Sequence, residues 1–220
     1  MTLDRAGENR RVLDPVERSS EILFGLIMVL SFTGSLSAAT AGREEVRTML
    51  FGAIGCNLAW GLVDAVMYLL EILIDRNRRL SMLHAVRRAR DPQTARGLIA
   101  DALPAVLAPL LRPADFEHLR GQLALLPEPP ARARLTSMDL RGASGVFLLV
   151  FLSTFPVVVP FIVIPAPRLA LRISNAVAIA MLFVAGHRLG AYSGLGPVRT
   201  GLAMVGVGIV LVLVTVALGG

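Results

Sequence analysis

The sequence predicts an all-α integral membrane protein with five transmembrane helices and a small cytosolic helical insertion between helices 2 and 3. Composition gives two reasons. Even without glycine, 55% of the 220 residues are apolar, whereas soluble domains reach about 45–50% with glycine included. Only 17% are charged, against about 25% in soluble proteins. These values exclude an ordinary cytosolic enzyme and a disordered chain, and the single cysteine excludes a disulfide scaffold.

The third reason is that the charged residues leave five long apolar runs. A helix needs about 20 mostly apolar residues to cross a bilayer. The second run contains only Asp64 and Glu71 as charged residues, and the fourth contains Arg172. Spanning β-strands would be about 9–11 residues long and would alternate apolar with polar residues, which these runs do not. The five runs cover residues 22–42, 48–74, 142–167, 169–187 and 200–220.

The basic residues, all arginine, predict the orientation of these helices. Cytosolic loops carry an excess of Arg and Lys. With the amino terminus in the cytosol, only the arginines at 43, 47, 168 and 172 lie outside. The carboxyl terminus is then outside as well. The isoelectric point near 11.0 thus reflects membrane topology and attraction to anionic lipid rather than nucleic-acid binding.

The same pattern divides the chain into four parts. No transit segment precedes the first run, and the composition is rich in alanine and arginine without lysine. A prokaryotic plasma membrane is therefore expected. The parts are a cytosolic amino-terminal segment at 1–19, helices 1 and 2 at 20–75, the insertion at 76–138, and helices 3 to 5 at 139–220.

Proline and aspartate positions predict the helices of the insertion. The arginine-rich segment 75–90 is expected to continue the second run as a helix into the cytosol. Asp91 and Pro92 then fit the N-cap and first position of a new helix. Two further prolines, Pro104 and Pro109, are expected to kink or divide the next apolar stretch, and a last helix is expected to begin near Pro113.

Two groups in the insertion have the residue types of metal ligands. Asp115, Glu117 and His118 form a D-x-E-H sequence, and Met82 lies two residues before His84. A structural explanation is stronger for both groups. Acids in the first turn of a helix stabilise its dipole, and Met82 with His84 fits an ordinary helix face.

Acidic and amide side chains inside the second run are the most informative feature. Asn57, Asp64 and Glu71 are spaced by seven residues, so they fall nearly in one line on a helix. A carboxylate near the bilayer centre costs at least about 2.5–3.5 kcal/mol, so such residues usually face a bundle interior or a water-filled path. Oxygen ligands suit divalent cations, and thioethers of Met28 and Met67 would add soft ligands.

These five residues also have simpler explanations, which the sequence leaves open. Glu71 lies near the inner interface, where it would reach toward water or pair with an arginine. Asn57 would satisfy itself by a hydrogen bond to a neighbouring helix. Met28 and Met67 are compatible with ordinary packing. Only Asp64 lies so deep that a functional role is the better explanation.

Two prolines, Pro156 and Pro160, interrupt the third run. They free backbone carbonyls on one side of the helix, which is tolerated in a bilayer only against protein or water. The sequence does not decide between a kink that shapes packing and a wall of a polar path.

The layout resembles the vacuolar iron transporter family. The best local matches are Ile22-Leu-Phe-Gly-Leu26, the proline-rich third run, and Pro197-Val-Arg-Thr-Gly-Leu-Ala-Met204 through Thr215. The resemblance implies five spans, a cytosolic helical insertion, a homodimer, and export of ferrous iron or manganese from the cytosol in exchange for protons. The sequence departs from the family where Ile27 and Met28 replace an acidic–glycine pair, and where Met67 replaces the glutamate before Tyr68.

The resulting expectation is a divalent-cation transporter with iron or manganese as cargo and no resident cofactor. Asp64 would be the main ligand or proton carrier, with Glu71 at the cytosolic mouth and Asn57 on the outer side. Expected partners are a second copy, the lipid bilayer and the ion, but not nucleic acid. The chain has no nucleotide-binding or catalytic motif, so it is not expected to be an enzyme. The alternative is a non-transporting membrane scaffold or regulator with the same fold.

Overall fold

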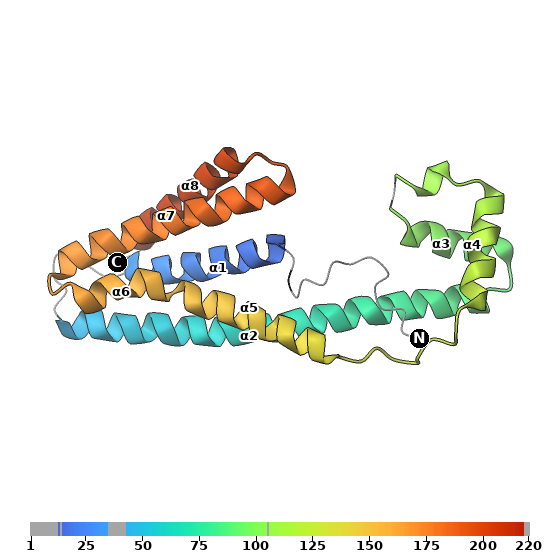
Figure 1. The fold of residues 1–220 in the computed structure, drawn as a ribbon, viewed down its shortest axis with the longest axis horizontal. Coiled ribbons are helices and arrows are strands. Elements are labelled where there is room, and N and C mark those ends of the chain that lie inside the picture. Colours follow the sequence, from blue (N-terminus) through green and yellow to red (C-terminus); the bar gives the residue numbers. More distant parts are fainter. Residues whose placement is uncertain (1–12, 14, 35–42, 105, 218–220) are drawn as a thin grey trace. The chain divides into compact units, whose positions relative to one another are not determined.

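The computed structural model describes residue 13 and residues 15–34, 43–104 and 106–217. These residues form helices and connecting turns, without a strand among them (Figure 1). Contacts divide them into two compact units, one holding the residues up to Tyr68 together with those from Ser137 on, and the other holding Leu69–Thr136. The second unit covers most of the predicted insertion and begins earlier than its expected start at residue 76.

Eight α-helices and one short 3-10 helix, η1, succeed each other along these residues. The predicted continuation of the second run into an arginine-rich helix is confirmed, because both belong to one uninterrupted helix, α2. In order, the elements are α1 (Pro15–Gly34), α2 (Arg43–Arg88), α3 (Pro92–Ala102), η1 (Ala108–Leu110), α4 (Pro113–Leu125), α5 (Ser137–Ser153), α6 (Phe155–Val163), α7 (Pro167–Ser193) and α8 (Pro197–Ala217).

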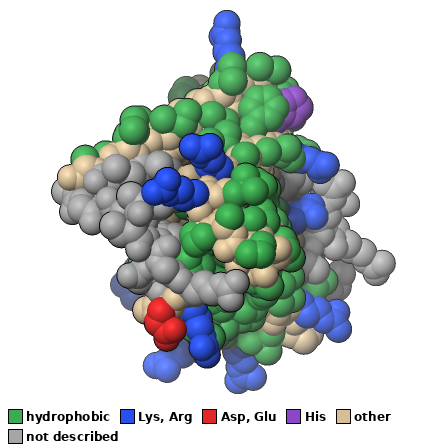
Figure 2. Space-filling model, turned by 90° about the vertical axis from the view of Figure 1, so that its left-hand side faces the viewer, with side chains coloured by type: hydrophobic (Ala, Val, Ile, Leu, Met, Phe, Trp, Pro, Cys, Tyr) green, Lys and Arg blue, Asp and Glu red, His purple; other side chains and the backbone are tan. Residues whose placement is uncertain are grey.

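Three helical stretches of the described residues are long and apolar enough to cross a membrane. They are Val46–Arg88, Ser137–Val163 and Pro167–Ser193, and Pro197–Leu211 is a shorter apolar helix. On the face drawn in Figure 2, hydrophobic side chains form most of the described surface, with arginines between and around them. The protein is thus an all-helical chain with the features of a membrane protein. The expected first run extends into residues 35–42, which lie outside the described residues.

The core of the first unit lies where α1, α6 and α7 meet. Aliphatic side chains fill it, and its fully buried members include Leu26, Leu30, Val157, Val158, Ala178 and Leu182. Helix α8 packs closely on α7, where Gly186 and Gly201 leave room for Met204 and Phe183 of the facing helix. Helix α7 ends at Ser193 and is capped by Gly194, which adopts the left-handed conformation with φ 73° that glycine accepts without steric cost.

A proline breaks the third run into two helices. Pro156 has no N–H for the carbonyl one turn earlier, and its ring crowds that carbonyl. Helix α5 accordingly ends at Ser153 and α6 begins at Phe155, with Thr154 buried at the break. Pro160, in contrast, stays inside α6. The third run, expected as one transmembrane helix, is therefore divided into two, and the break places a buried hydroxyl in the middle of the apolar run.

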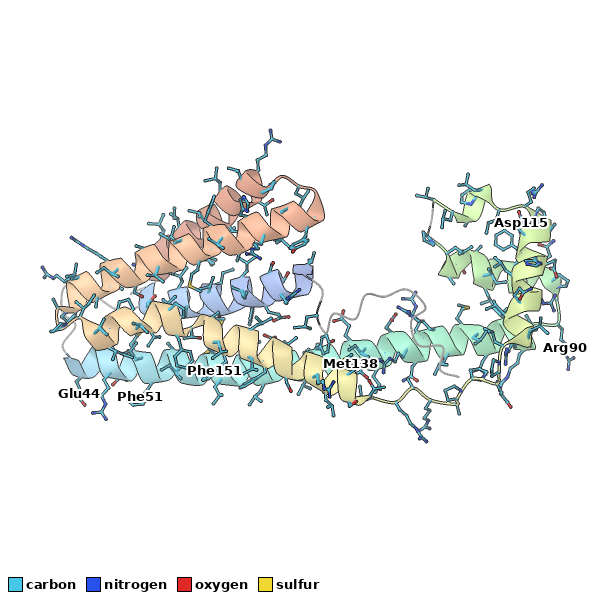
Figure 3. The ribbon with its side chains drawn as sticks, in the orientation of Figure 1. Glu44, Phe51, Arg90, Asp115, Met138 and Phe151 are labelled. Carbon is cyan, nitrogen blue, oxygen red and sulfur yellow. The ribbon has the colours of Figure 1, made fainter. Side chains whose placement is uncertain are left out.

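The predicted helix starts in the second unit are confirmed. Asp91 caps α3 by accepting a hydrogen bond from the Thr94 backbone N–H at 2.9 Å, and Pro92 takes a first-turn position. Helix α4 begins at Pro113, and Asp115 in its first turn accepts from the Arg112 backbone N–H at 2.8 Å. Figure 3 labels Asp115 at this helix start.

Arginine side chains tie the helices of the second unit together. Arg87 of α2 donates to the Leu123 carbonyl at 2.9 and 3.1 Å and also to the carbonyl of Leu126. Arg120 of α4 donates in return to the Ala89 carbonyl, just past the end of α2, at 3.0 Å. Both arginines thus satisfy carbonyls that a helix end leaves without partners.

Replacing Gly25 by alanine tests the close approach of α1 to α5. A Cβ at Gly25 would lie 2.7 Å from the Val150 carbonyl oxygen and would also strike the Ser153 hydroxyl. We expect Gly25→Ala to lower the free energy of unfolding in detergent by about 1–3 kcal/mol, as overpacking does. Gly55→Ala is the control, because nothing lies within 4 Å of a Cβ at Gly55. Equal free energies of unfolding for the two variants would contradict the close packing of α1 on α5 at Gly25.

The cap of α3 should depend on pH. Hydrogen bonds from Thr94 lower the pKa of Asp91 below its ordinary value of 3.8. The contribution of the Asp91 cap to the stability of α3 is therefore complete above pH 3.8 and is lost as pH falls through the lowered pKa. Hydrogen exchange of the α3 amides, corrected for intrinsic rates, should show this loss in the full chain. Asp91→Asn should keep the cap without the pH dependence, and Asp91→Ala should lose protection at neutral pH. Unchanged exchange in Asp91→Ala would refute the role of the cap.

Candidate functional site

The candidate site is the polar side of α2. Its three predicted members differ in how deeply they are buried. The side chain of Asn57 is fully buried, Asp64 is partly buried, and Glu71 is exposed. All three belong to one continuous helix, so their spacing keeps them on one side of it. Asn57 and Asp64 lie in the first unit, whereas Glu71 belongs to the second.

Asn57 joins three helices through one amide group. Its Nδ2 donates to the Gly25 carbonyl of α1 at 3.3 Å and to the hydroxyl of Thr154 at the break between α5 and α6. This is the interhelical hydrogen bond that was expected as the simpler explanation of Asn57. Its Oδ1 is buried and has no hydrogen-bond partner among the described residues.

Asp64 lies where α2 faces α5. Gly61, three residues earlier, packs against Phe147 of α5. A Cβ added at Gly61 would lie 3.1 Å from the Phe147 ring. Tyr68, four residues after Asp64, packs against Gly142, which also belongs to α5. Residues three and four apart share a helix face, so these two contacts flank Asp64 on either side.

One oxygen of the Asp64 carboxylate is shielded from solvent but accepts no hydrogen bond from the described residues. Its Oδ2 is buried and has no hydrogen-bond partner among the described residues. Phe147, which contacts Gly61, begins a row of rings with Phe151 and Phe155 along α5 and α6, with ring centroids 5.7 and 5.2 Å apart. Figure 3 labels Phe151 within this row. An uncompensated buried carboxylate is costly, so this oxygen is a natural position for a proton or a cation.

The two predicted methionines do not join Asp64 in a cluster. Met67 is 58% exposed on the flank of α2, and Met28 is partly buried on α1. Within the part of the chain that the structure describes, no group of three or more His, Cys, Asp or Glu side chains is placed to hold a metal ion. One chain therefore offers a single shielded carboxylate at this place rather than a complete ligand set.

The acidic group in the insertion has structural partners. Asp115 caps α4, and the backbone hydrogen bond from Arg112 lowers the pKa of its carboxyl. Glu117 lies 3.6 Å from Arg120 in an ion pair one turn along the helix. His118 is exposed, and Met82 packs against the core of Val86, Ile99 and Phe116. The structural explanation of both groups therefore accounts for their positions.

Two contributors to the site, Gly25 and Thr154, were not anticipated as partners of Asn57. A signal for Thr154 is present in the sequence, since it directly precedes the Phe155-Pro156 pair that ends a helix. Gly25 lies within the Ile22–Leu26 match to the transporter family. Neither signal reveals that Asn57 is the partner. Helix periodicity shows which residues share one side of a helix, but it does not show which residues of another helix they contact.

The class that the fold and the site define is an all-helical membrane protein with a shielded carboxylate in its longest helix. A scan against protein-family models and a search of curated proteins both found no match to the chain. The resemblance to vacuolar iron transporters therefore remains a prediction from the residues.

A double-mutant cycle tests the hydrogen bond between Asn57 and Thr154. We expect Asn57→Ala and Thr154→Val each to lower the free energy of unfolding, with a coupling energy of about 0.5–3 kcal/mol. Cys56→Ala, one residue away on a different flank of α2, should combine additively with Thr154→Val. Additive effects of Asn57→Ala and Thr154→Val would show that the two side chains do not interact.

Proposed function

We propose that the chain is a membrane transporter that moves a divalent cation, iron or manganese, out of the cytosol. The observation that carries this proposal is the buried Oδ2 of Asp64, which has no hydrogen-bond partner among the described residues. Carboxylates at membrane depth are rare and mark ion or proton paths. Carboxylate oxygen also suits Mn²⁺.

The proposed topology has five spans. Helices α1, α2, the pair α5–α6, α7 and α8 would each cross the bilayer, with the unit Leu69–Thr136 on the cytosolic side. Three of these stretches are long and apolar enough, and the arginine distribution favours a cytosolic amino terminus and an outer carboxyl terminus. The membrane would be a prokaryotic plasma membrane.

A homodimer would complete the site. Of the three apolar stretches, α2 is the least covered, with 11% of its most apolar part buried against 33% and 44% in the others. Trp60 and Met67, one turn before and after Asp64 on its flank, are 41% and 58% exposed. A two-fold contact along this flank would place the two copies of Met67 beside each other, one turn from the two Asp64 residues, because the same patch meets itself in such an interface.

Proton coupling follows from the chemistry of the ligand. A carboxylate binds a cation only in its deprotonated form, so binding releases a proton and protonation releases the cation. In this scheme Asp64 carries either the ion or a proton. Glu71, exposed in the second unit, would receive the ion at the cytosolic mouth, Asn57 would lie on the outer side, and Met28 would act as a further soft ligand.

A non-transporting scaffold or regulator is the second candidate. The interhelical hydrogen bonds of Asn57 favour it, because the Nδ2 of this residue has its packing partners without any ion. In that case Asp64 would be protonated and would serve only the contact between α2 and α5.

Flux into liposomes separates the two candidates. Purified protein should take up Fe²⁺ or Mn²⁺ under a proton gradient, and Asp64→Asn should slow the uptake on the order of 10–100-fold, as the loss of a metal-site group does. Glu44→Gln, an exposed acid on the same helix, should leave the rate unchanged. Wild-type protein without flux would rule out transport, whereas equal flux in Asp64→Asn would remove Asp64 from the path.

A further inference from the structure

A continuous groove runs along the first unit between α1, α5 and α7. One part has a volume of about 620 Å³ and the other about 500 Å³. The two parts share Arg18, Ile22, Leu149 and Met181, so they adjoin. Their volumes fall in the range of small-molecule sites, about 300–1,000 Å³.

Charge is concentrated at one end of this groove. Arg18 lies near the beginning of α1, Arg188 lies near the end of α7, and Tyr192 comes one turn later. Both arginines line the same cavity and are exposed, and no ion pair joins either of them to an acidic side chain of the described residues. Two arginines on one cavity are suited to the oxygens of a phosphate, which arginine binds through paired N–H donors.

Most of the remainder of the groove is apolar, with Ser19 and Ser153 as its other polar residues. Ile22, Leu149 and Met181 line both parts, and Leu148 and Leu152 extend the wall along α5. A soluble phosphate would use the arginines but would leave this wall exposed. A molecule with a phosphate at one end and hydrocarbon at the other matches the whole groove. Basic pockets between transmembrane helices bind anionic lipid head groups in this way.

We propose that this groove binds an anionic phospholipid. The phosphate lies between Arg18 and Arg188, Tyr192 borders the head group, and acyl chains lie along Ile22, Leu149 and Met181. The site is separate from Asp64, since none of the residues that line the groove belongs to α2. It therefore does not depend on the transport proposal.

Lipid binding can be measured on the full-length protein in a zwitterionic detergent. We expect added phosphatidylglycerol, but not phosphatidylcholine, to raise the melting temperature and to remain bound in native mass spectrometry. Arg18→Gln/Arg188→Gln should weaken phosphatidylglycerol binding about tenfold or more, because both charge-assisted hydrogen bonds to the phosphate are lost. Ala180→Trp, which fills the groove without changing charge, should weaken it as well.

The matched control is Arg141→Gln/Arg199→Gln, which removes the same charge from two exposed arginines that do not line the groove. This variant should bind the lipid like the wild type. An equal loss of phosphatidylglycerol binding in both double variants would overturn the proposed site, because the lipid would then respond only to the general surface charge. A shift of the same size with inorganic phosphate would overturn the lipid as ligand, and unchanged binding in both Arg18→Gln/Arg188→Gln and Ala180→Trp would overturn the groove.

Discussion

The hydrogen bond between the Asn57 amide and the Thr154 hydroxyl is the interaction on which the first unit depends. Pro156 breaks the helix in the middle of an apolar run and leaves a buried hydroxyl at the break. In lipid no water is available to satisfy such a group, so a side chain from another helix must do so. Asn57 does this and also reaches the α1 backbone at Gly25. One amide thereby fixes the relation of α1, α2 and the α5–α6 break.

This junction also determines the direction in which Asp64 faces. The two residues are seven positions apart on an uninterrupted helix, so anchoring Asn57 turns Asp64 toward α5. Gly61 and Tyr68, which contact α5 on either side of it, hold the same orientation. A carboxylate is thus kept beside α5 with one oxygen shielded. Packing alone would be served better by an apolar side chain, since burying an unpaired charge is destabilising.

Much of the fold could be predicted from the sequence, because apolar length and proline chemistry are local. The third and fourth runs correspond to α5–α6 and α7, and Asp91 and Pro113 begin helices as expected. The site could be predicted only in part. Periodicity placed Asn57 and Asp64 on one side of a helix, but it carries no information about which distant residue faces them. Thr154 is separated from Asn57 by 97 positions, and the pairing of Arg18 with Arg188 in one groove is equally non-local.

Labelling of Asp64 by a hydrophobic carbodiimide is the most direct test of the central claim that this carboxylate faces a cation path. Such reagents modify protonated carboxyls in apolar surroundings, and peptide mass spectrometry locates the product. We expect Asp64 to be modified in the wild-type protein and Mn²⁺ to protect it, while labelling of the exposed Glu44 does not respond to the metal. An unchanged rate of Asp64 modification at saturating Mn²⁺ would contradict the claim, because a cation bound at this oxygen excludes the proton that the reagent requires.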